Sequence, residues 1–267
     1  MHTSVKQSGA THFKPASQSR TGQYIYAIAD ASATAPAGMR GIDACEIGMV
    51  TEGVVAAAVS ACTRQRIRPE RAHLAAHNEV LKKLMENGTV LPMVFGTVAD
   101  GDDALRRMLR RNQKEFIREL NRVRGKVEMG LRVIWDVPNI FEYFVDTHDE
   151  LREARDRLAG RGREPSQDDK IELGRLFDRM LGEERDTQFE KLDGVLSDAC
   201  HEIKRMPPKD VNEVVCLSCL VGRDDQEAFE DAVFRAANLF DNNYSFDMNG
   251  PWAPHNFVEM NLKLNGR

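Results

Sequence analysis

The sequence predicts an α+β protein made of two folded halves, and two observations support this fold class. Short apolar runs of strand length alternate with longer segments in which apolar residues recur at helical spacing. The order strand, helix, strand, helix, strand appears in both halves of the 267-residue chain. We therefore expect two α+β sandwiches, each a small sheet covered by helices, with a long charged helical insert in the second.

The first half is expected to form an N-terminal α+β domain at residues 23–125, after a flexible polar tail at residues 1–22. Its strands are predicted from apolar runs, and the dipeptide Glu52-Gly53 suits a tight hairpin between two of them. An Ala-, Gly- and Pro-rich loop separates the first strand from that hairpin. The predicted strands are Tyr24–Ala29, Cys45–Val50 and Val54–Ser60.

Two helices are expected to cover this sheet. Pro69 stands where the first residue of a helix often stands, so a helix is predicted over Glu70–Asn87. A second helix over Asp100–Arg124 opens with acidic residues, which complement the positive end of the helix dipole. Between the helices, Val90–Phe95 is a buried strand or extended run, and Pro92 inside it indicates a sheet edge.

The second half is expected to form a C-terminal domain at residues 126–267. Apolar side chains alternate along Val127–Trp135 with a period of two, as they do in a strand. Residues 139–206 form the insert, which is mostly helical and highly charged, and Pro207-Pro208 ends it. The further predictions are a strand at Val211–Val221, a helix at Asp224–Phe240, a strand at Tyr244–Met248, a rigid turn at Gly250–Pro254, and a short strand or docking tail at Phe257–Leu264.

The composition argues against several classes of protein. Lys+Arg 37 against Asp+Glu 42 gives a net charge of −5, and aromatic residues are 7%, so a nucleic-acid partner is not expected. The longest run without a charged residue, Asn87–Ala99, has 13 residues, whereas a membrane-spanning helix needs about 20. Five cysteines show no disulfide-framework spacing, and no secretory signal is visible, so we expect a cytoplasmic protein with no membrane partner.

Two short motifs resemble metal sites, and for both we favour a structural interpretation. Cys216 and Cys219 have the Cys-x-x-Cys spacing that binds zinc or exchanges disulfides, but residues three apart on a strand point to opposite faces. His73 and His77 share a helix face, yet a leucine replaces the glutamate that zinc hydrolases carry directly after the first histidine. No metal site is therefore predicted.

Charged segments offer three further candidates, which we interpret as solvated surface. The loop with Arg157, Arg161 and Arg163 lacks the spacing of a phosphate-binding loop and does not follow a strand. One helix is basic, but acidic residues are interleaved in it, and no carboxylate pair lies in a recognisable apolar pocket. We expect no catalytic residue and no cofactor. The basic residues are Arg106, Arg107, Arg110, Arg111, Lys114 and Arg118, and the acidic candidates are Asp168, Asp169, Glu172, Glu183, Glu184 and Asp186.

Three segments resemble gas vesicle proteins of the F/L family. The most specific is His77–Val98, HNEVLKKLMENGTVLPMVFGTV, which is similar to the family's run of helix, glycine and Leu-Pro-Met-x-Phe-Gly-Thr. The opening strand Tyr24–Ile28 is similar to the family's aromatic-rich first strand. Gly250–Val258, GPWAPHNFV, is similar to its C-terminal Gly-Pro-Trp-Pro-Pro-Tyr-x-Phe pattern. With the strand that ends at Trp135, the resemblance covers Tyr24–Val258.

This resemblance implies a fold and a role. The fold is an N-terminal α+β domain followed by a modified ferredoxin-like domain. The role is that of a non-enzymatic accessory or minor structural protein of the cytoplasmic gas vesicle. Such a protein binds the hydrophobic main shell protein, assists nucleation and assembly, and keeps the shell protein from aggregating. Other gas vesicle accessory proteins are further expected partners, and no cofactor is implied. The chain departs from the family pattern at Val94, Ala253 and His255, where a basic residue, a proline and an aromatic residue are common.

The resemblance also marks individual residues. Because methionine-containing apolar segments adapt to irregular apolar partners, Leu91, Met93, Val94 and Phe95 are candidate contacts for the shell protein. The alternative is that they are ordinary core. Trp252 and Phe257 are expected to hold the C-terminal segment against the body. The motif residues expected to be structural are His77, Gly88, Pro92, Gly96, Trp135, Gly250, Pro251, Trp252, Pro254 and Phe257.

A rival class is a ferredoxin-like ligand-binding regulator or enzyme with a cleft between its domains. A convergent pocket with strongly shifted pKa values favours this rival. A filled seam between the domains, free of polar groups, favours the assembly role instead.

Overall fold

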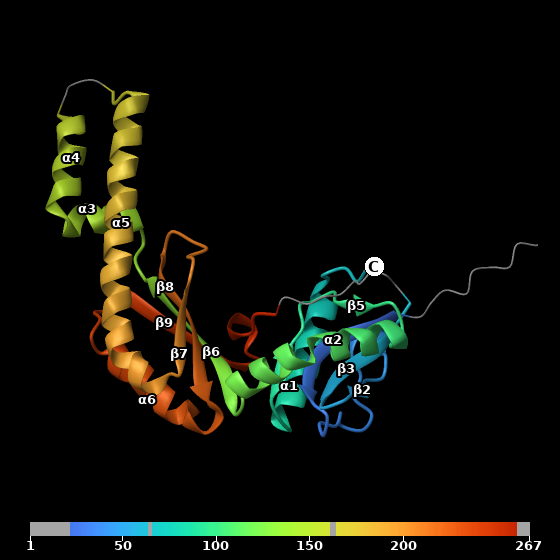
Figure 1. Ribbon diagram of the computed structural model, residues 1–267. Coiled ribbons are helices and arrows are strands. Elements are labelled where there is room, and N and C mark those ends of the chain that lie inside the picture. The colour runs from blue at the N-terminus through green and yellow to red at the C-terminus, as the bar shows by residue number, and fades with distance from the viewer. Residues whose placement is uncertain (1–21, 64–65, 161–163, 261–267) are drawn as a thin grey trace, which may run out of the picture.

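The structure is a computed structural model that describes residues 22–63, 66–160 and 164–260 (Figure 1). The N-terminal half, residues 22–125, and the C-terminal half, residues 126–260, each hold one sheet. The two sheets lie side by side, and a long helical arm extends from the C-terminal half. Of the predicted polar tail, only Gly22 lies within the described residues, and it already belongs to the first strand.

The N-terminal sheet is antiparallel, with the strand order β2-β3-β1-β4 and with β5 also paired to β1. The turn between β2 and β3 confirms the hairpin, and Gly53 there has a φ of +63°, which glycine adopts without strain. The short strand β4 lies at the sheet edge, as Pro92 indicates. The strands are β1 Gly22–Asp30, β2 Gly48–Glu52, β3 Val55–Cys62, β4 Val90–Pro92 and β5 Val98–Ala99.

Helices cover both faces of this sheet. Tyr24 and Tyr26 of β1 pack in one core cluster with α1 (Arg71–Glu86), while Ile25 and Ile28 pack in another with α2 (Asp102–Arg122). Strand β1 is therefore apolar on both faces, which explains its nearly continuous apolar sequence. A 3-10 turn, η1 Ile42–Ala44, precedes β2.

One predicted helix start, Glu70, is one residue too early. Helix α1 begins at Arg71 because its N-cap, Glu70, has an extended backbone with φ −75° and ψ 148°. Pro69 therefore precedes the cap instead of opening the helix.

The C-terminal sheet is antiparallel with the order β7-β8-β6-β9. Helical segments connect β6 to β7 and β8 to β9, so the chain order is βαββαβ, which is the ferredoxin-like arrangement. It is modified because three helices replace the first connecting helix. The strands are β6 Lys126–Trp135, β7 Glu202–Met206, β8 Glu213–Gly222 and β9 Tyr244–Trp252.

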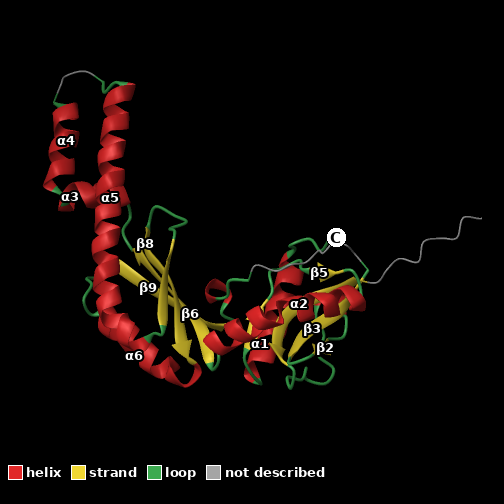
Figure 2. Ribbon diagram, in the orientation of Figure 1, coloured by secondary structure: helices red, strands yellow, loops and turns green. Residues whose placement is uncertain are grey.

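The helices of this half cover only one face of its sheet (Figure 2). The C-terminal part of α5 (Gln167–Leu196) packs on the alternating apolar residues of β6 and β8, together with α6 (Gln226–Ala237). The N-terminal part of α5 extends beyond the sheet, and α3 (Ile140–Thr147) and α4 (Asp149–Ala159) fold back along it. Short 3-10 turns are η2 Ser197–Ala199, η3 Arg223–Asp225 and η4 His255–Phe257.

Two predicted boundaries in this half are wrong. The helical stretch ends at Leu196 rather than near Met206, and Glu202–Met206 forms β7, whose charged residues suit an edge strand. Strand β9 continues to Trp252 through the predicted rigid turn. After it, Phe257 is the buried residue of the 3-10 turn η4, and the last residues of the predicted Phe257–Leu264 segment lie outside the described ranges.

Candidate functional site

The two most specific family-like segments meet where the halves join. Leu81 and Met85 of α1 line one hollow of about 260 Å³ together with residues 251–256 from the other end of the chain. Burial is the main cause that lowers the pKa of the neighbouring His77 to about 4, and the positive charge of His255 nearby contributes to the same shift. Segments far apart in the sequence thus form one region.

His77 is the centre of a buried ring cluster that ties α1 to β1. Its Nδ1 shares a 2.9 Å hydrogen bond with the Tyr24 hydroxyl, and its ring stacks on Tyr26 at 5.5 Å between centroids. The Gly96 amide donates to the same Tyr24 hydroxyl at 3.2 Å, and Phe95 packs 5.7 Å from the His77 ring. Burial raises the pKa of Tyr24 to about 12. These contacts place His77 and Gly96 in the packing of α1 against β1.

The candidate contact segment is mostly buried. Leu91 and Met93 belong to the core between β1 and α2, and the Met93 amide donates to the Tyr26 carbonyl at 2.9 Å. Phe95 is half-buried. Val94, in contrast, is 79% exposed. The alternative that this segment is core therefore describes Leu91 and Met93, and Val94 is the one candidate contact that presents most of its side chain to solvent.

Gly88 lies at a contact between the halves. Arg223 opens the 3-10 turn η3 directly after β8, and its guanidinium donates to the carbonyl oxygens of Met85 and Gly88, the latter at 3.1 Å. These carbonyls terminate α1, where a cation is favourable because it faces the negative end of the helix dipole. Gly88 is thus part of the interface between the N-terminal and C-terminal halves, which we call the joint.

The C-terminal motif has one buried and one exposed anchor. Phe257 is fully buried among residues of α2 and β1, as predicted. Trp252 is 45% exposed at the end of β9, where it pairs with Glu128 on the face of the sheet that no helix covers. That it holds the C-terminal segment to the body stays a prediction.

Other motif residues have structural surroundings. Gly250 has a φ of +125°, and a Cβ there would lie 3.0 Å from the Glu128 carbonyl oxygen, so only glycine fits this close approach to β6. Pro251 follows it in a cis peptide bond, and Pro254 is buried. Trp135 is buried with its ring 5.4 Å from Phe144.

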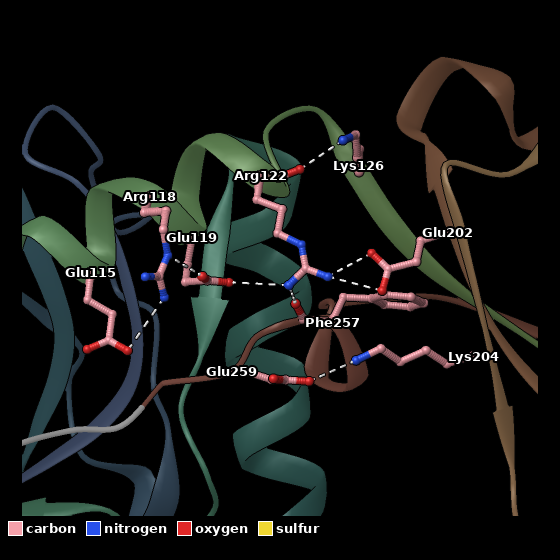
Figure 3. A network of polar contacts seen from close by, with 9 residues as sticks. All are labelled: Glu115, Arg118, Glu119, Arg122, Lys126, Glu202, Lys204, Phe257 and Glu259. Atoms are coloured by element: carbon pink, nitrogen blue, oxygen red, sulfur yellow. Dashed lines mark hydrogen bonds and ion pairs between the residues drawn. The ribbon is translucent and has the colours of Figure 1, made fainter.

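Arg122 is the centre of a polar network that crosses the joint (Figure 3). Its guanidinium donates to the Phe257 carbonyl at 2.8 Å and to the Glu202 carboxylate at 2.7 Å. Beside it, Lys204 pairs with Glu259 at 3.1 Å. The hydrogen bond to Glu202 raises the pKa of Arg122. The end of α2, strand β7 and the C-terminal segment are therefore held together by charged groups as well as by Phe257.

The uncovered face of the C-terminal sheet carries a second, larger hollow of about 550 Å³. Glu128, only 6% exposed, lines both hollows, and so does Trp252. The two Glu128 oxygens accept hydrogen bonds from the Asn256 backbone amide at 2.9 Å and its side-chain amide at 2.6 Å. Arg122, Glu128 and Asn256 are not among the site residues predicted from the sequence. For Glu128 there is a signal, because it is the one acidic residue in the apolar strand Val127–Trp135.

The joint therefore fits neither expectation completely. It is neither the polar-free seam expected of an assembly protein nor a pocket that gathers strongly shifted pKa values, as expected of a ligand-binding protein. It is not free of polar groups, because Arg122, Glu128 and Asn256 lie in it. It contains a hollow, but the strongly shifted His77 does not line that hollow. His255 does line it, but this residue is exposed to solvent.

The two metal-like motifs have structural explanations. Cys216 is half-buried and Cys219 fully buried on opposite faces of β8, and a hydrogen bond with the neighbouring Cys200 together with burial raises the pKa of Cys219. His73 turns to Asp43 at 3.2 Å rather than to His77. Within the described ranges, no group of three or more His, Cys, Asp or Glu side chains is arranged to hold a metal ion.

The charged segments also follow the structural interpretation. On α2, Arg106 pairs with Asp102 at 2.7 Å and Arg110 with Glu52 at 2.8 Å. In the insert, Asp169 forms a capping box with Ser166 at the start of α5. Arg157 lies in α4, whereas Arg161 and Arg163 fall outside the described residues. Among the helices that the structure describes, none combines the length and the apolar character needed to cross a membrane.

Comparison with known proteins gives a consistent set of relatives. The chain matches the family described as "Gas vesicle synthesis protein GvpL/GvpF" over residues 22–259. It is 27% identical to gas vesicle protein F of Streptomyces sp. (strain CB03234) over 241 residues, which cover 88% of this chain and 99% of that protein. It is also 27% identical to gas vesicle protein L1 of Halobacterium salinarum over 262 residues, which cover 89% and 90% of the two proteins.

Solved structures share this fold. The crystal structure of the gas vesicle protein GvpF from Anabaena sp. PCC7120 superposes with a TM-score of 0.78 at 19% identity, covering 90% of this chain and 99% of that one. The GvpF structure from Microcystis aeruginosa gives a TM-score of 0.76, also at 19% identity, over 90% and 100% of the two chains. The mixed helix and sheet architecture predicted from the sequence is therefore confirmed.

Proposed function

Because the chain belongs to the gas vesicle synthesis protein GvpL/GvpF family, we propose that it is a non-enzymatic accessory protein that binds the main shell protein of the gas vesicle. In this role it keeps the shell protein from aggregating, assists nucleation and assembly in the cytoplasm, and contacts other accessory proteins. The observation that carries the proposal is the family match over residues 22–259.

Exposed apolar side chains within the family-like segments support the proposal. Val94 follows the buried strand β4, and Trp252 ends the edge strand β9. A shell subunit with an exposed apolar face aggregates unless a partner covers that face. Side chains held outward by a rigid, well-packed scaffold are suited to cover it, because little conformational entropy is lost on binding.

The test is co-expression of this chain with the main shell protein, with measurement of how much shell protein stays soluble and co-purifies. We expect both quantities to rise relative to expression of the shell protein alone. A folded chain that neither binds the shell protein nor increases its solubility contradicts direct shell binding.

A pair of variants tests the contact at Val94. We expect Val94→Asp to lower the co-purified shell protein at least about fivefold, because a charge replaces an apolar contact. The matched control is Val54→Asp, which places the same change on an exposed valine of the β2–β3 hairpin and should leave binding unchanged. Equal loss in both variants contradicts a specific contact at Val94.

Ligand binding is the second candidate, and the hollow between α1 and residues 251–256 is the observation that favours it. Its volume of about 260 Å³ is small for a drug-sized ligand. A small molecule that raises the melting temperature of the wild type, but not of a Leu81→Trp variant that fills the hollow, would support this candidate.

A further inference from the structure

The uncovered face of the C-terminal sheet is polar and hollowed at its centre. Side chains on this face come from alternate residues of β6, β8 and β9, and the middle position on β6 is Gly130. With no side chain there, the hollow of about 550 Å³ opens above the sheet between Trp252 at one end and Arg132 at the other.

Charges in this hollow are incompletely balanced. Three carboxylates line it, Glu128, Glu213 and Asp247, against the two cations Arg132 and Lys209. Arg132 already pairs with Asp247 at 2.8 Å and with Glu213 at 3.7 Å. Glu128 has its two bonds from Asn256, but no lysine or arginine of the described residues forms an ion pair with it.

A buried carboxylate gains from a counter-charge, and this one has capacity for it. A carboxylate has about four acceptor sites, of which Asn256 uses two, so a planar donor group can still bind. Burial keeps such a bond from being screened by solvent. Position 128 therefore attracts a cation from outside the chain.

Trp252 stands beside Glu128 with a fixed orientation. The two residues are paired across β6 and β9, and the Trp252 indole donates to Asn249 Oδ1 at 2.7 Å. The residue is 45% exposed to solvent. An indole face next to a carboxylate is a favourable site for a guanidinium group, which stacks on the ring and binds the carboxylate with two parallel N–H groups.

We propose that this hollow receives the arginine side chain of a partner protein, with the guanidinium on Glu128 and against the Trp252 ring. Glu128 and Trp252 also line the smaller hollow, but its volume of about 260 Å³ is less than half of the 550 Å³ on the open sheet face, which therefore has more room for a side chain of the partner. The site rests on the proposed function, and it requires that the partner protein carry an exposed arginine.

The test uses the purified full-length chain and the peptide probe Ac-Gly-Leu-Arg-Leu-Gly-NH2, without any shell protein, so it can fail while shell binding holds, and the reverse. The indole N–H signals of Trp252 and of the buried Trp135 are followed by NMR during titration. We expect a saturable shift of the Trp252 signal and none of the Trp135 signal. The same peptide with citrulline in place of arginine keeps the shape without the charge, and it should bind at least about tenfold more weakly.

Variants localise the effect. Glu128→Gln should weaken arginine-peptide binding at least about tenfold, whereas Glu227→Gln, the same charge change on α6 behind the sheet, should not. A second pair of variants is followed by calorimetry. Trp252→Ala should weaken binding of the arginine peptide, whereas Phe234→Ala, which removes an exposed aromatic residue on α6, should not. Equal binding of the citrulline peptide, an unchanged affinity in both Glu128→Gln and Trp252→Ala, or no saturable shift up to about 10 mM peptide overturns the proposal.

Discussion

The two sheets of this protein differ in how they are covered. Helices α1 and α2 cover both faces of the N-terminal sheet, and its central strand is buried on each side. Helices α5 and α6 cover one face of the C-terminal sheet, while the other face keeps polar side chains and a hollow. A sheet closed on both faces serves stability, whereas a sheet open on one face can also bind a partner.

The joint between the halves lies between these two extremes. The C-terminal segment crosses from the open sheet face to the N-terminal core, into which it inserts Phe257. Substitutions should therefore cost most stability in the N-terminal core and at the joint, and least on the open face.

The largest expected effect is at Phe257. We expect Phe257→Ala to lower the free energy of unfolding by about 3–5 kcal/mol, because it leaves a cavity where the C-terminal segment enters the core. Urea denaturation followed by circular dichroism measures this change. A loss below about 1 kcal/mol would mean that this segment is not part of the core.

A pH dependence is expected from His77, which takes up a proton near pH 4 in the folded state and near pH 6.5 in the unfolded state. Between these values the unfolded state binds more protons, so the free energy of unfolding falls as the pH falls. His77 therefore contributes fully above pH 6.5, and its contribution, at most about 3 kcal/mol, is lost towards pH 4.

The measurement is urea denaturation between pH 7 and pH 4 for the wild type and for His77→Gln. The variant should show a shallower fall in stability. His73→Gln is the matched control on the same helix, because the Arg68 carbonyl and Asp43 raise the pKa of His73 and its contribution has the opposite sign. Identical pH profiles for the wild type and His77→Gln would contradict the buried, neutral state of His77.

A smaller effect is expected at Arg122. Arg122→Ala removes charge-assisted hydrogen bonds to Glu202 and the Phe257 carbonyl in a partly exposed network, and we expect a loss of about 1–2 kcal/mol. Arg110→Ala is the control, since the Arg110 side chain is 67% exposed against 37% for Arg122, and its pair with Glu52 should contribute less than about 0.5 kcal/mol. Equal losses would show that the network adds nothing to the joint.

The smallest effect is expected on the open face. Trp252→Ala should change the free energy of unfolding by less than about 1 kcal/mol, because the residue is 45% exposed, whereas Phe257 is fully buried. Denaturation of this variant beside Phe257→Ala compares the two aromatic anchors of one motif directly. A loss at Trp252 as large as at Phe257 would remove the distinction between the open face and the joint.

Much of the fold could be predicted from local patterns. The alternation along Val127–Trp135 identified β6, and helical spacing identified α2, because the buried face of each element is visible in its own residues. Strand β7 escaped prediction because its charged residues suit a sheet edge and produce no apolar signal.

The site could be predicted only in part. The family-like segments contain Phe257 and Trp252, but the sequence does not tell which of the two is buried. The network around Arg122 joins Glu202 and Phe257, and Glu128 meets Asn256, so each contact depends on how distant segments pack. Periodicity within one element carries no information on such contacts.

Hydrogen–deuterium exchange on the complex with the main shell protein tests the central claim most directly. We predict slower exchange on binding at residues 93–97 and 249–256, around Val94 and Trp252, and no change in the arm formed by α4 and the N-terminal part of α5. A complex in which slower exchange is confined to that arm, or absent from both segments, would contradict it.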